Sequence, residues 1–242
     1  MNECNFVNNT LNVRGALGGA VSVNGWSNMI SANKGAFINN SVRVGGGGAI
    51  YSGGSFTNIS LVEMLFSHNS ATYCGVLSID GTHHRSINFT ASMFTHNRAT
   101  GGIIGNDTGG VICIRNASIL ILNDTFYHNT AAGHAGVMQV EESFVIIMES
   151  VFDGNVARHD GGVLHMNSYP NSILIYNSLF INNRAGDDGG VLYIGRAGCR
   201  VRVNESTFGF NNAASRGGAF VVLGSLLELV DSQFYNLSLI HI

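Results

Sequence analysis

Four side chains able to do acid–base chemistry recur at one position of the sequence, directly before a pair of small residues. They are His134, Asp160, Asp188 and Arg216, spaced by 26 or 28 residues. If equivalent positions stack in space, the two aspartates lie about 5 Å apart at their roots, close to the carboxyl separation of retaining glycosidases. One aspartate would then be the acid and the other the base or nucleophile, with Arg216 neutralising a sugar acid.

The same residues also fit an ordinary polar corner, in which His134 and Arg216 offset the repulsion between Asp160 and Asp188. Calcium bridging the two aspartates is a third interpretation. A separate histidine group comprises His68, His96 and His128, each two residues after a phenylalanine. Stacked imidazoles could bind a metal or respond to pH, but these histidines could equally be solvated turn residues. We expect no cofactor.

The cysteines give no metal or disulfide pattern. Cys4, Cys74, Cys113 and Cys199 lack zinc-like spacing, and four cysteines are too few for a disulfide framework in 242 residues. The sequence therefore leaves the redox compartment open, and it predicts no bridge between Cys113 and Cys199.

These residues must be positioned by a repeated unit. Phenylalanine recurs in steps of 26 to 32 residues, and in eight of nine cases an asparagine follows it by three positions. A Gly-Gly pair or a small variant comes about ten residues after each phenylalanine, as in Phe180-Ile-Asn-Asn183 followed by Gly189-Gly190. A fixed period in this range indicates a solenoid, and no linker interrupts it, so we predict one domain over residues 1–242, a fragment of a longer array.

Within a repeat, apolar residues alternate with period two, which is typical of strands and not of helices. Leu192 and Ile194 follow one Gly pair at core positions, and Ile173 and Ile175 precede Phe180 in the same alternation. We therefore predict an all-β fold, a single-stranded parallel β-helix similar to pectate lyases, with about 8 rungs of about 28 residues. The asparagines would occupy left-handed corners and bond along the stack.

The outward positions of the strand before each phenylalanine are apolar in three successive rungs. They are Leu120 and Leu122, Ile146 and Met148, and Leu174 and Tyr176. A contiguous apolar patch on a monomer usually marks a contact surface. The alternative is that another segment of the chain covers it.

Composition and charge exclude several classes. Charged residues make up only 11% and the net charge is −3, with no basic stripe, so nucleic-acid binding is excluded. The longest apolar run, residues 219–230, is shorter than the roughly 20 residues of a membrane helix. Nine N-x-S/T sequons point toward a secreted glycoprotein, and four of them are our candidate glycosylation sites: Asn88, Asn116, Asn123 and Asn204.

The repeated F-x-x-N and G-G-[AV]-[ILFM] motifs, as in Phe152-Asp-Gly-Asn155 and Gly161-Gly-Val-Leu164, resemble the repeat of the chlamydial-type polymorphic outer membrane protein family. That resemblance implies a right-handed β-helix in a surface-exposed adhesin. Asp187 beside Asp188 also resembles the paired aspartates of polygalacturonases, which share this fold.

Two functional hypotheses follow. The first is an extracellular or cell-surface module, structural and adhesive, that contacts proteins or glycans and could self-associate. It rests on uniform inward positions beside variable outward ones, and on the apolar patch. The second is a polysaccharide lyase or glycoside hydrolase acting on uronic-acid polymers through Asp160, Asp188, Arg216 and His134.

Overall fold

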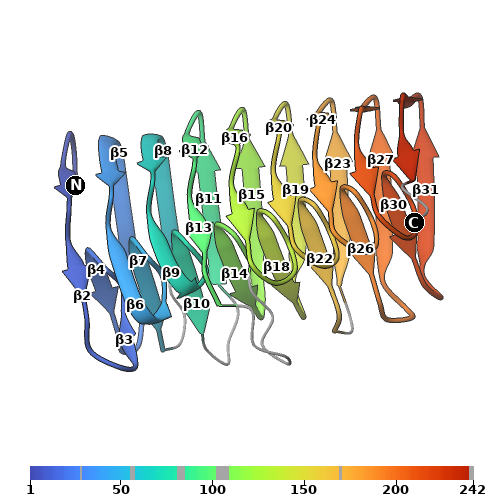
Figure 1. Ribbon diagram of the computed structural model, residues 1–242. Helices are drawn as coiled ribbons and strands as arrows, with labels where there is room; N and C mark the ends of the chain where they lie inside the picture. The colour runs from blue at the N-terminus through green and yellow to red at the C-terminus, as the bar shows by residue number, and fades with distance from the viewer. Residues whose placement is uncertain (28, 55–57, 81–84, 102–108, 169–170, 240–242) are drawn as a thin grey trace.

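The computed structural model describes residues 1–27, 29–54, 58–80, 85–101, 109–168 and 171–239. All regular structure in these residues is β-strand, and every strand pairing between them is parallel. The rungs follow one another along a single axis from the N-terminal to the C-terminal end (Figure 1). The predicted parallel β-solenoid of about 28 residues per turn is confirmed.

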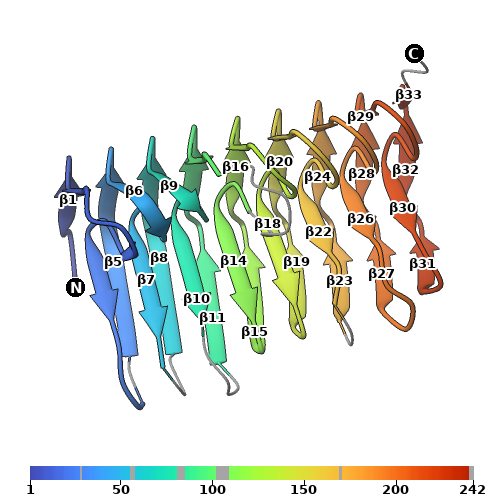
Figure 2. The same ribbon diagram turned by 60° about the horizontal axis from the view of Figure 1, so that its bottom comes forward.

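Three parallel sheets surround the core (Figure 2). Sheet A contains, before each phenylalanine, β5 (Met29–Ile38), β8 (Asn58–Ser67), β11 (Arg85–Thr90), β15 (Ala117–Leu122), β19 (Phe144–Met148), β23 (Ser172–Tyr176), β27 (Arg200–Asn204) and β31 (Leu226–Val230). It also contains the short strands that carry the phenylalanine: β1 (Asn5–Val7), β12 (Met93–Thr95), β16 (Thr125–Tyr127), β20 (Val151–Asp153), β24 (Leu179–Ile181), β28 (Thr207–Gly209) and β32 (Gln233–Tyr235).

Sheet B follows the asparagine corner, and the sequence analysis did not predict its strands. It contains β2 (Thr10–Leu11), β3 (Ala16–Leu17), β6 (Ser41–Gly46), β9 (Ser70–Tyr73), β13 (Arg98–Ala99), β17 (Thr130–Ala131), β21 (Val156–Ala157), β25 (Arg184–Ala185), β29 (Asn212–Ala213) and β33 (Ser238–Leu239). Sheet C follows the Gly-Gly corner with β4 (Val21–Val23), β7 (Ile50–Gly53), β10 (Leu77–Asp80), β14 (Ile112–Arg115), β18 (Met138–Glu141), β22 (Leu164–Met166), β26 (Leu192–Ile194) and β30 (Phe220–Val222).

The core is a stack of equivalent side chains, as the repeat predicts. Phe94, Phe126, Phe152, Phe180 and Phe208 are fully buried. Their rings stack nearly parallel, with successive centroids 4.5 to 4.8 Å apart. This spacing equals the distance between paired strands, so the backbone ladder and the ring stack share one period.

The asparagines form a buried ladder inside the corner that follows the phenylalanine. Asn155 is typical: its Nδ2 donates to Asn183 Oδ1 and to the carbonyl of Phe126, each at 3.0 Å. The expectation that these asparagines adopt the left-handed conformation is wrong. The residue before each of them does so, for example Asn182 with φ of 57°, which makes the bend and turns the following side chain inward.

The Gly-Gly corner meets both physical requirements for glycine. Gly161 has φ of +69°, a left-handed conformation. At Gly162 a Cβ atom would lie 2.1 Å from the carbonyl oxygen of Gly190, so the two corners could not stack. The recurring Gly-Gly pair of the sequence therefore marks a corner that depends on glycine.

One segment that looked irregular is regular. Met29 to Ala36 carries Ser, Asn, Lys and Gly in place of an aliphatic strand, a composition that predicts a poorly ordered rung. Instead it lies in β5, which pairs with β8 from Met29 to Ile38 and buries Ile30 and Ala32. The small Ala32 pairs in register with Leu61 of β8, a larger and fully buried side chain. The sequence also predicts an inserted loop at residues 100–108, which lies mostly outside the described residues.

Candidate functional site

The chemistry-bearing corner residues stack along the turn between sheet B and sheet C. Arg216 pairs with Asp188, its Nε lying 3.1 Å from both carboxylate oxygens. Asp188 is 6% exposed, and its backbone N–H donates to Asp160 Oδ1 at 3.1 Å. His134 Nδ1 lies 3.2 Å from the other oxygen, Asp160 Oδ2. The predicted proximity of these four residues is therefore found, as a chain of contacts from rung to rung.

The contacts of Asp160 favour its carboxylate over its carboxylic acid form. Burial by itself would raise the pKa of Asp160, but the hydrogen bonds from the His134 ring and from the Asp188 amide outweigh it. The pKa of Asp160 is consequently lowered from its ordinary value. The Asp188 carboxylate is occupied by the Arg216 guanidinium. A glycosidase needs one protonated carboxyl group near neutral pH, and this arrangement does not favour one at Asp160.

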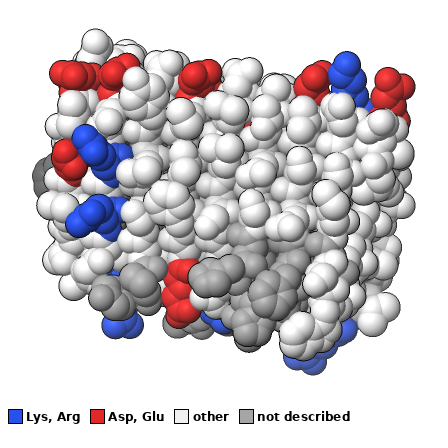
Figure 3. Space-filling view, turned by 180° about the vertical axis from the view of Figure 1, so that it is seen from behind, with Lys and Arg blue, Asp and Glu red and all other residues white. Residues whose placement is uncertain are grey.

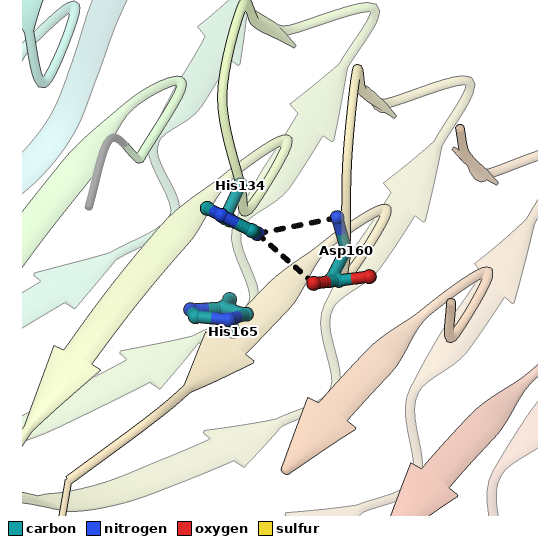
Figure 4. Close-up of side chains that lie close together, drawn as sticks. All are labelled: His134, Asp160 and His165. Atoms are coloured by element: carbon teal, nitrogen blue, oxygen red, sulfur yellow. Dashed lines mark hydrogen bonds and ion pairs between the residues drawn. The ribbon is translucent and has the colours of Figure 1, made fainter. Parts of the chain in front are cut away.

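His165 is a member of this cluster that the sequence analysis did not single out. It lies on β22 between Gln139 of β18 and Tyr193 of β26 in the parallel register. Its ring stacks on His134 with centroids 4.4 Å apart and on Tyr193 with centroids 5.2 Å apart. Figure 4 shows His134 and His165 one above the other, with Asp160 beside them.

The surroundings of His165 explain its state. The sequence predicted an outward, freely varying position, and His165 does alternate with core residues, yet it is only 2% exposed. Burial, followed by the nearby His134 ring, lowers the pKa of His165 to about 3, against an opposing effect of Asp160. The imidazole is therefore neutral near pH 7. No direct indication of this contact is present in the sequence, because His134 and His165 occupy different positions of the repeat. They meet because the chain bends at Gly161 and Gly162.

The histidine column has a different geometry. The rings of His68 and His96 stack with centroids 5.1 Å apart, and His128 lies 5.7 Å from His96. All three are in the left-handed conformation that Asn39 and Asn182 adopt at the same position. Histidine and asparagine both tolerate that conformation, which accounts for their exchange there. Burial, and then repulsion from His68 and His128, lowers the pKa of His96.

A disulfide joins Cys74 and Cys113, a pairing that the sequence analysis did not predict. Cys74 takes the place of the first corner glycine with φ of 55°, and Cys113 lies on β14 in the next rung. The two cysteines meet at the Gly-Gly corner of their rungs, and the equivalent corner of later rungs brings His134 to His165. Cys4 and Cys199 are free thiols.

Reduction of this disulfide should destabilise the chain. It closes a span of 39 residues, and cross-links of this kind contribute about 2 to 4 kcal/mol. We expect a reductant to lower the urea midpoint of the wild-type chain but not of the double variant Cys74→Ser, Cys113→Ser. An unchanged wild-type midpoint would show that the bond contributes nothing.

The outward residues of sheet A form an apolar face. Leu120, Ile146 and Leu174 are in register across β15, β19 and β23, as are Leu122, Met148 and Tyr176. All six alternate with buried residues; Tyr176 is 38% exposed and the other five are partly exposed. Phe144, 36% exposed in the adjoining outward column, extends the face and was not predicted. We call these seven residues the apolar face.

Charges lie around the apolar face and not on it. Figure 3 views the molecule from behind and shows a broad uncharged area, with charged groups along the upper row, at the left end and along the lower edge. β15, β19 and β23 carry no charged residue, whereas β27 carries Arg200 and Arg202. The Tyr176 hydroxyl donates to Glu205 Oε1 at 3.0 Å at the rim.

The four candidate glycosylation sites differ in accessibility. Asn123 is exposed in a turn with φ of 55°, so its side chain is the most available. Asn88 and Asn116 are half-buried. Asn204 is also half-buried, and its Oδ1 is buried without a hydrogen-bond partner among the described residues.

The fold and its repeat define the class of the molecule: a parallel β-solenoid whose rungs are joined by side-chain stacks and ladders. Residues 177–195 match the family model of the Chlamydia polymorphic membrane protein repeat. The match covers part of one rung, from the turn before Phe180 to the end of β26, and it confirms the resemblance seen in the motifs. Comparisons with curated proteins and with solved structures give no match. No helix in the described part of the chain could cross a membrane.

Proposed function

We propose that this chain is a cell-surface β-solenoid module that makes adhesive contacts with proteins through the apolar face. The observation that carries the proposal is the uncharged, outward-facing row of Leu120, Ile146 and Leu174 with its neighbours on a regular sheet. Water contact with such a row is unfavourable, and burying one large aliphatic side chain contributes about 1.5 to 3 kcal/mol.

Other features support a surface location. The matched repeat is described as one of a membrane protein, which suggests a surface-associated β-helix passenger. The Cys74–Cys113 disulfide fits an oxidising compartment. Asn123 is exposed within an N-x-S/T sequon.

The rigid solenoid suits such a role. Each rung pairs with its neighbours through backbone hydrogen bonds, so the apolar face is flat and its side chains repeat at the strand spacing of about 4.8 Å. A protein surface with exposed aliphatic or aromatic side chains, a second copy of this chain included, could bury this face. The binding energy would concentrate near the centre of the patch, at Ile146.

Ile146→Lys tests this proposal. Because the side chain points away from the core, the variant should fold as the wild type does, with an unchanged circular dichroism spectrum and urea midpoint. Beads coated with the wild-type chain should adhere to each other or to a monolayer of cultured epithelial cells. We expect Ile146→Lys to reduce that adhesion at least about tenfold, because one large apolar contact is lost and a charge is buried.

Ser60→Lys is the matched control. Ser60 lies in the same outward column, on β8, outside the apolar face. The Ser60→Lys variant adds the same charge as Ile146→Lys and should leave adhesion unchanged. Absence of adhesion by the wild-type chain, or equal adhesion of the three proteins, would refute the proposal. Unfolding of Ile146→Lys would instead show that the side chain faces the core.

A further inference from the structure

We propose that His134, Asp160 and His165 form a binding site for a divalent transition-metal ion, and that Zn²⁺ is the ion their side chains fit best. Two imidazoles and one carboxylate are a common protein ligand set for zinc, with a further position open to water. The site is separate from the apolar face and does not depend on the adhesive function.

The three side chains converge from two adjacent rungs. One ligand atom from each lies within 4.8 Å of the other two, and among the described residues this is the one group of three such side chains so placed. The separation of 3.2 Å between His134 Nδ1 and Asp160 Oδ2 is close to the distance between two ligands of one tetrahedral ion. Bonds of about 2.0 to 2.1 Å place tetrahedral ligands roughly 3.3 Å apart.

His165 is prepared for coordination by its neighbour Gln139. Its Nδ1 lies 2.8 Å from Gln139 Oε1, and an amide oxygen can only accept, so Nδ1 carries the proton. The lone pair is then on Nε2, the other ring nitrogen. Histidine ligands of metals typically donate their second nitrogen in this way, which fixes the tautomer and the ring orientation. Gln139 is 2% exposed, so this contact is well protected.

Asp160 is oriented from the opposite side. Its Oδ1 accepts the backbone N–H of Asp188, which leaves Oδ2 facing His134. Asp188 itself is paired with Arg216, so the guanidinium does not compete for Asp160. The carboxylate therefore offers one oxygen and one negative charge to an ion at this place.

His134 is the ligand that must move. The two imidazoles are stacked with an interplanar angle of 27°, and the lone pairs of stacked rings point in parallel rather than toward one point. A turn of the His134 ring about its side-chain bonds would bring one of its ring nitrogens toward the ion that His165 also binds. The His134 side chain is 31% exposed, so solvent is available on its outer side for that turn.

The test uses the full chain with Zn²⁺ alone and Co²⁺ alone as probes. We expect one ion per chain by competition with a chromophoric chelator, and a tetrahedral Co²⁺ absorption spectrum. His134→Gln and Asp160→Asn should each weaken binding at least about tenfold, and Gln139→Leu by about tenfold through the loss of the orienting contact. Circular dichroism confirms that each variant folds.

His159→Gln is the matched control. His159 lies beside the cluster, with its ring 5.4 Å from His134, but it bonds Asp187 and belongs to no ligand group. Its substitution should leave the affinity unchanged. Failure of the wild-type chain to bind either ion would overturn the proposal. Wild-type affinity in both His134→Gln and Asp160→Asn would also overturn it, because the ion would then be bound elsewhere, for example by His68, His96 and His128.

Discussion

Asn155→Ala is expected to destabilise the solenoid by about 4 kcal/mol. The Asn155 side chain makes four hydrogen bonds: its Oδ1 accepts the backbone N–H and the Nδ2 of Asn129, and its Nδ2 donates to Asn183 Oδ1 and to the Phe126 carbonyl. Alanine leaves the buried backbone N–H of Asn129 without its acceptor, and it removes one hydrogen bond each from Asn129 Nδ2, Asn183 Oδ1 and the Phe126 carbonyl. Each buried unsatisfied group costs about 1 to 3 kcal/mol.

Asn155→Asp separates hydrogen bonding from side-chain size. Aspartate has the same shape and keeps the Oδ1 acceptor, but it loses the Nδ2 donor and adds a buried charge, so it should be at least as destabilising. Asn204→Ala is the control, since Asn204 Oδ1 has no partner among the described residues. The measurement is the free energy of unfolding in urea. A loss in Asn155→Ala no larger than in Asn204→Ala would mean that the ladder is not a source of stability.

Asp124→Ser is expected to stabilise the chain at neutral pH by roughly 4 kcal/mol more than it does at pH 4. Asp124 replaces serine in a second buried ladder, where Ser150, Ser178 and Ser206 each bond the amide of the preceding rung. Asp124 is 1% exposed. Burial raises the pKa of its carboxyl group to about 7, although the amides of Ser92 and Leu122 donate to it.

The direction in which stability changes with pH follows from the raised pKa of Asp124. The folded state holds the proton of Asp124 more tightly than the unfolded state, in which the pKa is near 3.8. Its contribution to stability is therefore complete below about pH 4 and is lost as the pH rises through 7. A difference of about 3 pKa units corresponds to roughly 4 kcal/mol.

Urea unfolding of the wild type and of Asp124→Ser at several pH values from 4 to 8 measures this difference. The free energies of the two proteins should diverge as the pH rises. Asp187→Ser is the control, because the Asp187 side chain is 56% exposed and its exposed pair with His159 contributes little. Parallel pH profiles for Asp124→Ser and the wild type would contradict a buried, protonated Asp124.

Repetition determined how much could be predicted. The stacked Phe126, Phe152 and Phe180 and the buried asparagines repeat at a fixed spacing, because each inward position meets the same environment in every rung. The register of Leu120, Ile146 and Leu174 followed from the same period. A period identifies positions that stack, but it does not give backbone torsion angles, so the left-handed conformation was assigned one residue too late.

Single departures from the repeat were not predicted. The Cys74–Cys113 disulfide and the contact of His165 with His134 each join two different positions of the repeat across a corner. Their proximity depends on how tightly the chain bends, which the alternation of residues does not specify. The serine ladder was present in the sequence as a repeated serine two residues before phenylalanine, and reading that position would have identified Asp124 as an exception.

Oxidative footprinting of the adherent chain tests the central proposal most directly. Met148 lies in the apolar face, whereas Met29, 77% exposed, lies at the start of β5 outside it. Both methionines should be oxidised in the free chain. In chains bound to the cell monolayer or to each other, we expect oxidation of Met148 to fall several-fold while that of Met29 stays the same. Equal oxidation of Met148 in the free and the adherent chain would contradict adhesion through this face.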